Sequence, residues 1–469
     1  MNPTKENIET REDKKGSVRN NIAYALPTLP VFLLMGGPMS VMPGLYVKYF
    51  GLSLGAIALA KVLSRIFDGL TDPVIGYISD VYQQRFGTRK PLVVAGCVFS
   101  LLTATMLYIP YGWDAQQSES VYFSYFLFFF LAYTLAWTVF DIPHLAWGAD
   151  ISSDSTGRSQ RFGIRSMMSY SAPLLFFSIP LLPIFNTTEI TPETLEYAVY
   201  LAWALMPVCL FLCLNYVPDS EKFFVSEKGD YSSKKISLKN SIRLIIDNRP
   251  LLCFYMAYAL VGVGYVMSNS LTFFFVDNYL GLADKMSYVF MVHFGVGACT
   301  SWFWGVAAKK IGPRPIWAIG VFLCVLGLLG VGFIHPSGTS FWPYIFFKAI
   351  IGAGFISTFV AGYMLLASIV DYGKWKFDQD CSGTYFALNS IVFKFNAAIG
   401  AAIGLFFADI LGFDATETIM SEVSVFALRL PYIVIPVILL ILAIIVISQI
   451  PLSKNQQLRI RQRLEARVI

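Results

Sequence analysis

The sequence predicts an all-α integral membrane protein with twelve transmembrane helices in two six-helix bundles. Of the 469 residues, 56% are hydrophobic and only 14% are charged, against about 25% charged residues in soluble domains. The mean hydropathy is +0.60, and the apolar residues form separate stretches long enough to cross a bilayer. Soluble enzymes, secreted domains and disordered chains are excluded, because one soluble core cannot bury so much apolar surface.

The apolar stretches are separated by short polar loops, with one exception. A long polar gap at residues 218–249 follows the sixth stretch, and we expect it to be a cytoplasmic linker between bundles at 22–217 and 250–451. Tails are expected at 1–21 and 452–469. A membrane helix needs about 20 apolar residues, and the predicted spans are 22–48, 53–81, 91–110, 121–148, 162–185, 196–217, 250–278, 285–308, 315–334, 341–371, 382–411 and 426–450.

The distribution of positive charge predicts the orientation. Lys and Arg gather in both tails, in the linker and in alternate loops, whereas the opposite loops hold only Lys48, Lys285 and Arg429. By the positive-inside rule both termini face the cytoplasm of a cell membrane. The formal charge of +5 is too small to indicate a nucleic-acid partner, and a monomer in the lipid bilayer is expected.

A repeated loop supports the division into halves. The second span is followed by Gly76-Tyr-Ile-Ser-Asp80 and Arg85-Phe-Gly-Thr-Arg89-Lys-Pro, and the eighth by Gly305 and then a shorter basic run, Lys309-Lys-Ile-Gly-Pro-Arg-Pro. The same Gly-then-basic loop at the same place in each half predicts parallel halves related by an axis along the membrane normal.

Four ionisable residues lie on one face of the second predicted span. Lys61, Arg65, Asp68 and Asp72 fall within an arc of roughly 60° when each residue turns the helix by about 100°. An ionisable residue at the bilayer centre costs roughly 2.5–3.5 kcal/mol on a translocon scale. These side chains must therefore face protein, water or each other. A functional site is the default interpretation of such residues, and a closed ladder of salt bridges from Arg65 to both acids is the alternative.

The fourth span supplies partners for these acids. Thr138, Asp141 and His144 are spaced three apart and share one face. Three carboxylates and a hydroxyl suit Na⁺ or Li⁺, whereas two carboxylates forced together would hold a proton. We predict a cation site at Asp68, Asp72, Thr138 and Asp141, which would be the metal ligands if the ion is Na⁺; no other cofactor is expected. His144 alone is more often hydrogen-bonded filler than a ligand.

Further polar residues within the spans are candidates for substrate binding. Arg165 opens the fifth span, Lys394 lies too deep in the eleventh to reach water, and Asn269 belongs to a neutral polar patch in the seventh. Lys348 begins the tenth span near its outer end, and we expect it to extend to the interface without a functional role. The predicted substrate-binding residues are Asp141, Arg165, Lys394, Asn269, Lys61 and Arg65.

The stretch Arg65-Ile-Phe-Asp68-Gly-Leu-Thr-Asp72-Pro, with the Gly76 loop behind it, resembles the glycoside-pentoside-hexuronide:cation symporter family of the major facilitator superfamily, in particular its melibiose-permease-like members. The resemblance implies the major facilitator fold and a cation site at Asp68, Asp72, Thr138 and Asp141, with Asp141 also touching the sugar. It further implies that Arg165 binds sugar or gates, that Asp371-Tyr-Gly belongs to the motif ending the tenth span, and that Lys394 is the family's lysine of the eleventh span.

One departure from the family bears on the substrate. Members of the melibiose-permease type have a sugar-binding Asp in the first span, whereas residues 29–34 here contain no acid or amide. Galactoside binding of that type is therefore not implied. The extra cation Lys61, together with Arg65, Arg165 and Lys394, favours an anionic substrate such as a hexuronate. A second branch that resembles this family carries lysophospholipids, which leaves an amphiphile open.

Together these features predict a secondary active transporter that couples Na⁺ or H⁺ to uptake of a small molecule, a sugar, glycoside or hexuronide, by alternating access between the two halves. Asp80, Arg85, Arg89 and Asp371 are the predicted gating residues, although the basic loops can equally act as topology signals alone. A lysolipid carrier on the same scaffold and a receptor without transport activity are the alternatives. An enzyme is not expected, because the sequence contains no HExxH, GxSxG or P-loop motif.

Overall fold

The computed structural model describes residues 18–110, 119–151, 155–219, 245–378, 382–415, 417 and 420–465. The predicted all-α membrane class is confirmed, since the described residues form helices and connections without a strand. The chain divides into two compact units, Met1–Gly229 and Asp230–Ile469, and each is described by itself. Most of the predicted linker at 218–249 and of the tail at 1–21 lies outside the described residues.

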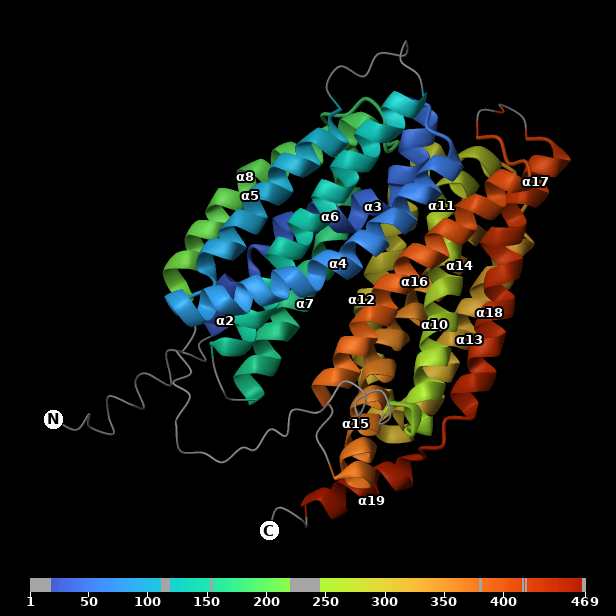
Figure 1. Cartoon of the computed structure of the whole chain (residues 1–469). Coiled ribbons are helices and arrows are strands. Elements are labelled where there is room, and N and C mark those ends of the chain that lie inside the picture. The colour runs from blue at the N-terminus through green and yellow to red at the C-terminus, as the bar shows by residue number, and fades with distance from the viewer. Residues whose placement is uncertain are drawn as a thin grey trace. The chain divides into compact units, whose positions relative to one another are not determined.

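Unit 1 is coloured blue to green in Figure 1. Two of its helices end at a glycine: α3 at Gly51 with φ 70° and α4 at Gly87 with φ 73°. Glycine adopts this left-handed conformation readily. Its described helices are α2 (Val18–Ala25), α3 (Thr28–Phe50), α4 (Leu54–Phe86), α5 (Lys90–Tyr108), α6 (Glu119–Asp150), α7 (Ser155–Ser178), η1 (Ile179–Leu181) and α8 (Pro192–Tyr216).

Unit 2, green to red in Figure 1, differs in containing three π-helical turns. These are η2, η4 and η5; the described part of unit 1 has none. Its described elements are α10 (Arg249–Ser270), α11 (Thr272–Phe274), η2 (Phe275–Tyr279), η3 (Ala283–Lys285), α12 (Met286–Ile311), α13 (Pro313–Gly332), α14 (Phe341–Ser357), η4 (Thr358–Gly362), α15 (Tyr363–Phe377), α16 (Ser382–Ile410), α17 (Glu422–Arg429), η5 (Leu430–Val434), α18 (Ile435–Ser448) and α19 (Lys454–Glu465).

Ten helices among the described residues are long and apolar enough to cross a membrane. Two of the twelve predicted spans, α4 and α7, are absent from this set. They are long helices, but α4 carries Lys61, Arg65, Asp68 and Asp72, and α7 carries Arg165. The helices that fall short in apolar character are therefore two that hold predicted site residues.

Within unit 1, the helices with site residues pack side by side. The helix α6 lies against α4 and α5, and α7 lies against α3 and α2. Gly96 is needed where α5 approaches α6, because a Cβ there would come within 2.4 Å of the Phe140 nitrogen. The charged face of α4 is thus held beside the face of α6 that carries Thr138 and Asp141.

The segments predicted to be cytoplasmic gather at one end of each unit. In unit 1, the Arg19 guanidinium lies 3.8 Å from the centre of the Tyr216 ring, and Lys90 Nζ lies 3.3 Å from Asp219 Oδ1. In unit 2, α19 packs against α15, and Lys454 Nζ donates to the carbonyl of Lys310 at 2.6 Å. The basic loops thus brace one another at the helix ends.

Candidate functional site

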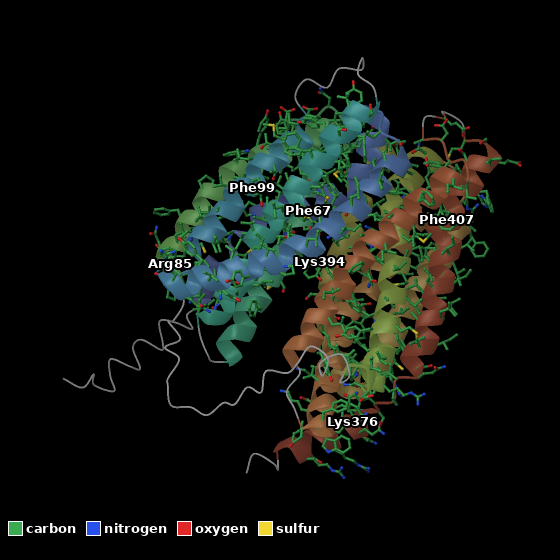
Figure 2. All side chains as sticks on the ribbon, viewed as in Figure 1. Phe67, Arg85, Phe99, Lys376, Lys394 and Phe407 are labelled. Atoms are coloured by element: carbon green, nitrogen blue, oxygen red, sulfur yellow. The ribbon has the colours of Figure 1, made fainter. Side chains whose placement is uncertain are left out.

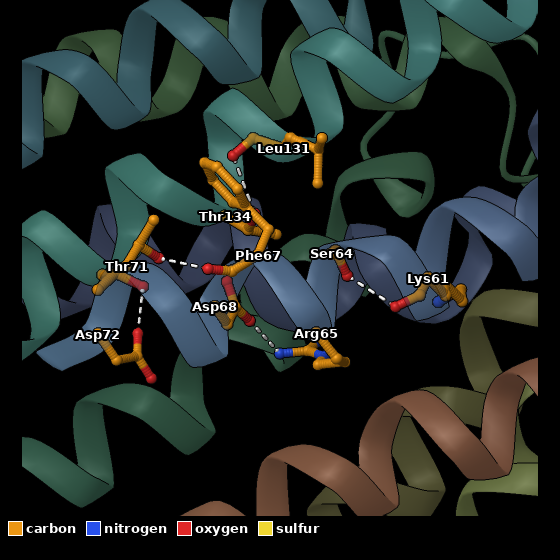
Figure 3. Close-up of polar contacts among 10 residues, drawn as sticks. Lys61, Ser64, Arg65, Phe67, Asp68, Thr71, Asp72, Leu131 and Thr134 are labelled. Atoms are coloured by element: carbon orange, nitrogen blue, oxygen red, sulfur yellow. Dashed lines mark hydrogen bonds and ion pairs between the residues drawn. The ribbon is translucent and has the colours of Figure 1, made fainter.

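The charged face of α4 carries an ion pair along the helix and a hydrogen bond across to α6 (Figure 3). Arg65 Nη1 donates to Asp68 Oδ2 at 2.7 Å, with the Asp68 side chain 3% exposed and that of Arg65 17% exposed. One helical turn further, Asp72 Oδ1 accepts from Thr138 Oγ1 at 3.1 Å. Arg65 thus pairs with Asp68, whereas Asp72 bonds to the fourth span. A ladder of salt bridges from Arg65 to both acids does not describe this arrangement.

The contact between Asp72 and Thr138 shows the register of α4 and α6. As the second and fourth spans, these two helices run in the same direction. Asp68 lies four residues before this level on α4, and Asp141 three residues after it on α6. At 1.5 Å per residue the two outer acids differ in height by about 10 Å. Accordingly, the described residues contain no group of three or more His, Cys, Asp or Glu side chains placed to hold a metal ion.

The third carboxylate, Asp141, forms an ion pair with Arg165 of α7. The guanidinium is also held from a second side, because Arg165 Nε donates to His144 Nδ1 at 3.2 Å. Its Cζ lies 5.9 Å from the centre of the Phe32 ring. The two residues of unit 1 for which the resemblance implied sugar contact, Asp141 and Arg165, therefore meet directly.

Two residues that the sequence did not mark for the site complete this cluster. His144 Nε2 lies 2.9 Å from the carbonyl oxygen of Tyr24, and the Tyr24 hydroxyl donates to the carbonyl of His144 at 2.6 Å. Both side chains are fully buried. The spacing of His144 three residues after Asp141 was the available signal for its role, whereas no pattern marked Tyr24, which lies on the short helix α2.

Lys61 lies on the same face of α4 but is not drawn into these pairs. Its side chain is half-buried, and no ion pair of its amine is found among the described residues. In Figure 3 it lies one turn beyond Arg65, where its carbonyl accepts from Ser64 Oγ at 2.8 Å. Of the two cations on this face of α4, only Arg65 forms an ion pair with a carboxylate within the described part of the chain.

Two of the four predicted gating residues contact each other. Arg89 Nη2 lies 2.9 Å from Asp80 Oδ1, and the Arg89 side chain is largely buried while that of Asp80 is exposed. Arg85 instead places its guanidinium 5.4 Å from the centre of the Phe86 ring. Asp371 is half-buried on α15 in unit 2. The Asp80–Arg89 pair joins the end of α4 to the start of α5.

In unit 2, the two predicted substrate-binding residues lie at different heights. Lys394, labelled on α16 in Figure 2, is half-buried. Two residues further, Asn396 Nδ2 donates to the carbonyl of Tyr258 on α10 at 3.0 Å. Asn269 lies eleven residues beyond Tyr258 on α10, which is about 16 Å of helix. The structure therefore does not place Lys394 and Asn269 at one level.

The expectation that Lys348 extends to the membrane interface is wrong. Lys348 is 3% exposed, and its Nζ donates to Thr272 Oγ1 at 3.1 Å. Its backbone carbonyl lies 3.3 Å from His293 Nδ1. The side chain turns inward because the hydroxyl of α11 offers a polar partner inside the unit, which a count of residues from the helix end cannot reveal.

Ion pairs buried inside the spans of a helical membrane protein are typical of carriers and of other proteins that move ions or bind ligands within the membrane. The chain is a member of the family described as "MFS/sugar transport protein", whose model matches residues 23–454. It is 23% identical over 461 residues to the uncharacterized symporter YnaJ of Bacillus subtilis, covering 97% of this chain and 96% of that protein. It is 24% identical to the glucuronide carrier protein homolog of Escherichia coli, covering 94% and 92%.

The fold agrees with this membership. The inward-open xylose transporter XylE from E. coli superimposes with a TM-score of 0.60 at 12% identity, covering 95% of this chain and 98% of that one. The predicted major facilitator fold and the resemblance to the glycoside-pentoside-hexuronide:cation symporters are therefore confirmed. The protein is a multi-pass membrane carrier of small molecules and not an enzyme.

Proposed function

We propose that this carrier is a symporter that couples the entry of Na⁺ or H⁺ to uptake of a sugar, glycoside or hexuronide by alternating access. The observation that carries the proposal is the row of three carboxylates in unit 1. Asp72 bonds to Thr138 at its centre, and Asp68 and Asp141 lie on either side, each held by an arginine. The cation would bind at Asp72 and Thr138 and take a further oxygen ligand from Asp68 or Asp141, once a local movement brings one of these carboxylates to that level.

Competition between the cation and the arginines gives a physical basis for coupling. In the conformation described, Arg65 and Arg165 already neutralise Asp68 and Asp141. A cation gains these carboxylate oxygens only when an arginine moves away. The displaced guanidinium then presents its fork of N–H donors to a hydroxyl or carboxylate of the substrate. Because binding of each ligand frees a group for the other, each raises the affinity for the other by the same factor.

The substrate class rests on the donors that become available. A guanidinium binds a planar carboxylate through two parallel hydrogen bonds, so Arg165 suits a uronic acid better than a neutral sugar. The similarity to a glucuronide carrier protein homolog supports the same class. We therefore place hexuronides first among the candidate substrates and neutral glycosides second.

The same reasoning extends to orientation. The basic segments that gather at one end of each unit would face the cytoplasm by the positive-inside rule. Both termini would then be cytoplasmic in the cell membrane, and the protein would work as a monomer.

The test is uptake by purified protein in proteoliposomes, with an inward gradient of Na⁺ or of protons, using a methyl glucuronide, lactose and a lysophosphatidylcholine as substrates. Asp72→Asn is the test variant, and Asp284→Asn, an exposed acid outside the spans, is the matched control. We expect gradient-driven accumulation of the glucuronide in the wild type and the control, and its loss in Asp72→Asn.

Each outcome decides a part of the proposal. Accumulation driven by Na⁺ identifies the ion, and accumulation driven only by the proton gradient assigns the same carboxylates to proton binding. Unchanged coupling in Asp72→Asn would refute the site. Transport of the lysolipid alone would replace the proposed substrate class with an amphiphile.

A further inference from the structure

His144 lies between the ion pair of the proposed cation site and the first short helix of unit 1. We propose that His144 is a positioning residue: in its neutral form, with the proton on Nε2, it holds Arg165 against Asp141, and Tyr24 of α2 selects that tautomer. This inference rests on the proposed function of Asp141 and Arg165, and it names what sets the strength of their pairing.

The hydrogen-bond partners determine the tautomer. Arginine has only N–H donors, so the contact of Arg165 Nε with His144 Nδ1 at 3.2 Å requires an Nδ1 that accepts. A backbone carbonyl can only accept, so the contact of His144 Nε2 with the Tyr24 oxygen at 2.9 Å requires an Nε2 that donates. Both contacts are satisfied together only by a neutral imidazole protonated on Nε2.

The surroundings prevent the ring from turning to another arrangement. His144 is fully buried, and its ring is stacked between Tyr24, with centres 4.2 Å apart, and Phe140, with centres 4.9 Å apart. The Tyr24 hydroxyl returns a hydrogen bond to the His144 carbonyl at 2.6 Å. Gly148 makes room for this pairing, because a Cβ there would lie 2.2 Å from that hydroxyl.

The consequence is that Arg165 is held at two points. Its Nε is fixed by His144 and its Nη2 by Asp141, so the plane of the guanidinium is set. Without the acceptor at Nδ1, the arginine retains one partner and can rotate about its remaining bond. The pair with Asp141 is then weaker, and a cation competes for that carboxylate more easily.

Two amide substitutions separate the functions of the two ring nitrogens. The Asn side chain can place an oxygen near the position of Nδ1, so His144→Asn keeps an acceptor for Arg165. The longer Gln side chain reaches the position of Nε2, so His144→Gln keeps a donor for Tyr24 but removes the acceptor. A role in packing alone would be affected similarly by both changes.

The first measurement reads the tautomer in the wild-type protein, and a variant is needed only to assign the signal. The chain has three histidines, so ¹⁵N-histidine labelling gives few signals in solid-state NMR, and the resonances lost in His144→Asn identify this residue. We expect the Nε2–H tautomer at neutral pH. An Nδ1–H tautomer or an imidazolium would overturn the inference, whatever the transport assay shows.

The second measurement is the cation concentration that gives half-maximal uptake. We expect His144→Gln to lower it about tenfold, the equivalent of one hydrogen bond to a charged group, and His144→Asn to stay near the wild type. His335→Gln, at an exposed loop position, is the matched control. Equal effects of Asn and Gln at 144 would refute the positioning role. Loss of cation dependence from the wild type would instead refute the proposed function, while the tautomer result would stand.

Discussion

The ion pair between Arg65 and Asp68 gives a stability prediction that can be worked from its geometry. The Arg65 Nη1 to Asp68 Oδ2 distance is 2.7 Å, and the side chains are 17% and 3% exposed, so both charges are largely removed from water. Removing one partner of a buried pair costs about 3–5 kcal/mol, because the other charge stays buried alone. We expect Asp68→Asn near the lower end of this range, since Arg65 keeps some contact with solvent, and Arg65→Gln near the upper end.

The double variant separates the pair from its surroundings. With both charges removed no buried charge is left unpaired, so the double variant should be more stable than the sum of the two single changes predicts, by about 2–3 kcal/mol. The assay is unfolding of the four proteins in one detergent, with Asp284→Asn as the control. Additivity within about 0.5 kcal/mol would show that the two side chains do not interact.

The same set of proteins tests the competition proposed for the cation. In Arg65→Gln, the Asp68 carboxylate has lost its internal positive partner, so Na⁺ should stabilise this variant more than it stabilises the wild type. Choline chloride is the control for ionic strength. An equal rise in unfolding temperature for both proteins would contradict a direct competition between Arg65 and the ion.

Two further predictions concern buried positions elsewhere. Gly148→Ala should displace the Tyr24 hydroxyl, with which the new Cβ would overlap at 2.2 Å, and lower stability by about 1–3 kcal/mol; Gly163→Ala, with open space around its Cβ, should be neutral in the same thermal unfolding assay. Lys348→Met should raise the unfolding midpoint, because methionine removes a buried amine that donates to Thr272. Each kcal/mol of stability gained corresponds to a rise of about 2–4 °C. A fall in midpoint would show that the amine is needed for stability.

The fold was predictable because membrane spans are marked by length and composition alone. A stretch of apolar residues has no stable alternative to a helix in lipid, so α5 and α13 could be placed from the sequence within a few residues. The charged helix α4 was predicted as a span at 53–81 with the other apolar stretches, and the shared face of Arg65, Asp68 and Asp72 then marked it as a candidate site. Its ionisable residues give it low hydropathy, although it is the longest described helix of unit 1.

The site was predictable only to the level of which residues share a helix face. Helical spacing placed Asp68 and Asp72 on one face but could not say that Arg65 would pair with the first and Thr138 bond to the second. Pairing depends on the register between α4 and α6, which is set by packing between the two helices and leaves no periodic trace in either segment. For the same reason the contact of Arg165 with His144, which joins two different helices, could not be derived from spacing.

The π-helical turns of unit 2 change how its sequence should be compared with those of relatives. Each such turn accommodates about one residue more than an α-helical turn, so side chains beyond it are rotated by about 100° relative to a regular wheel. Along the chain, Lys348 comes before η4 and Asp371 comes after it. A wheel drawn through residues 341–377 without this correction assigns them to the wrong relative faces. An alignment to a relative that lacks the turn would misplace every later position in that span unless it places a gap there.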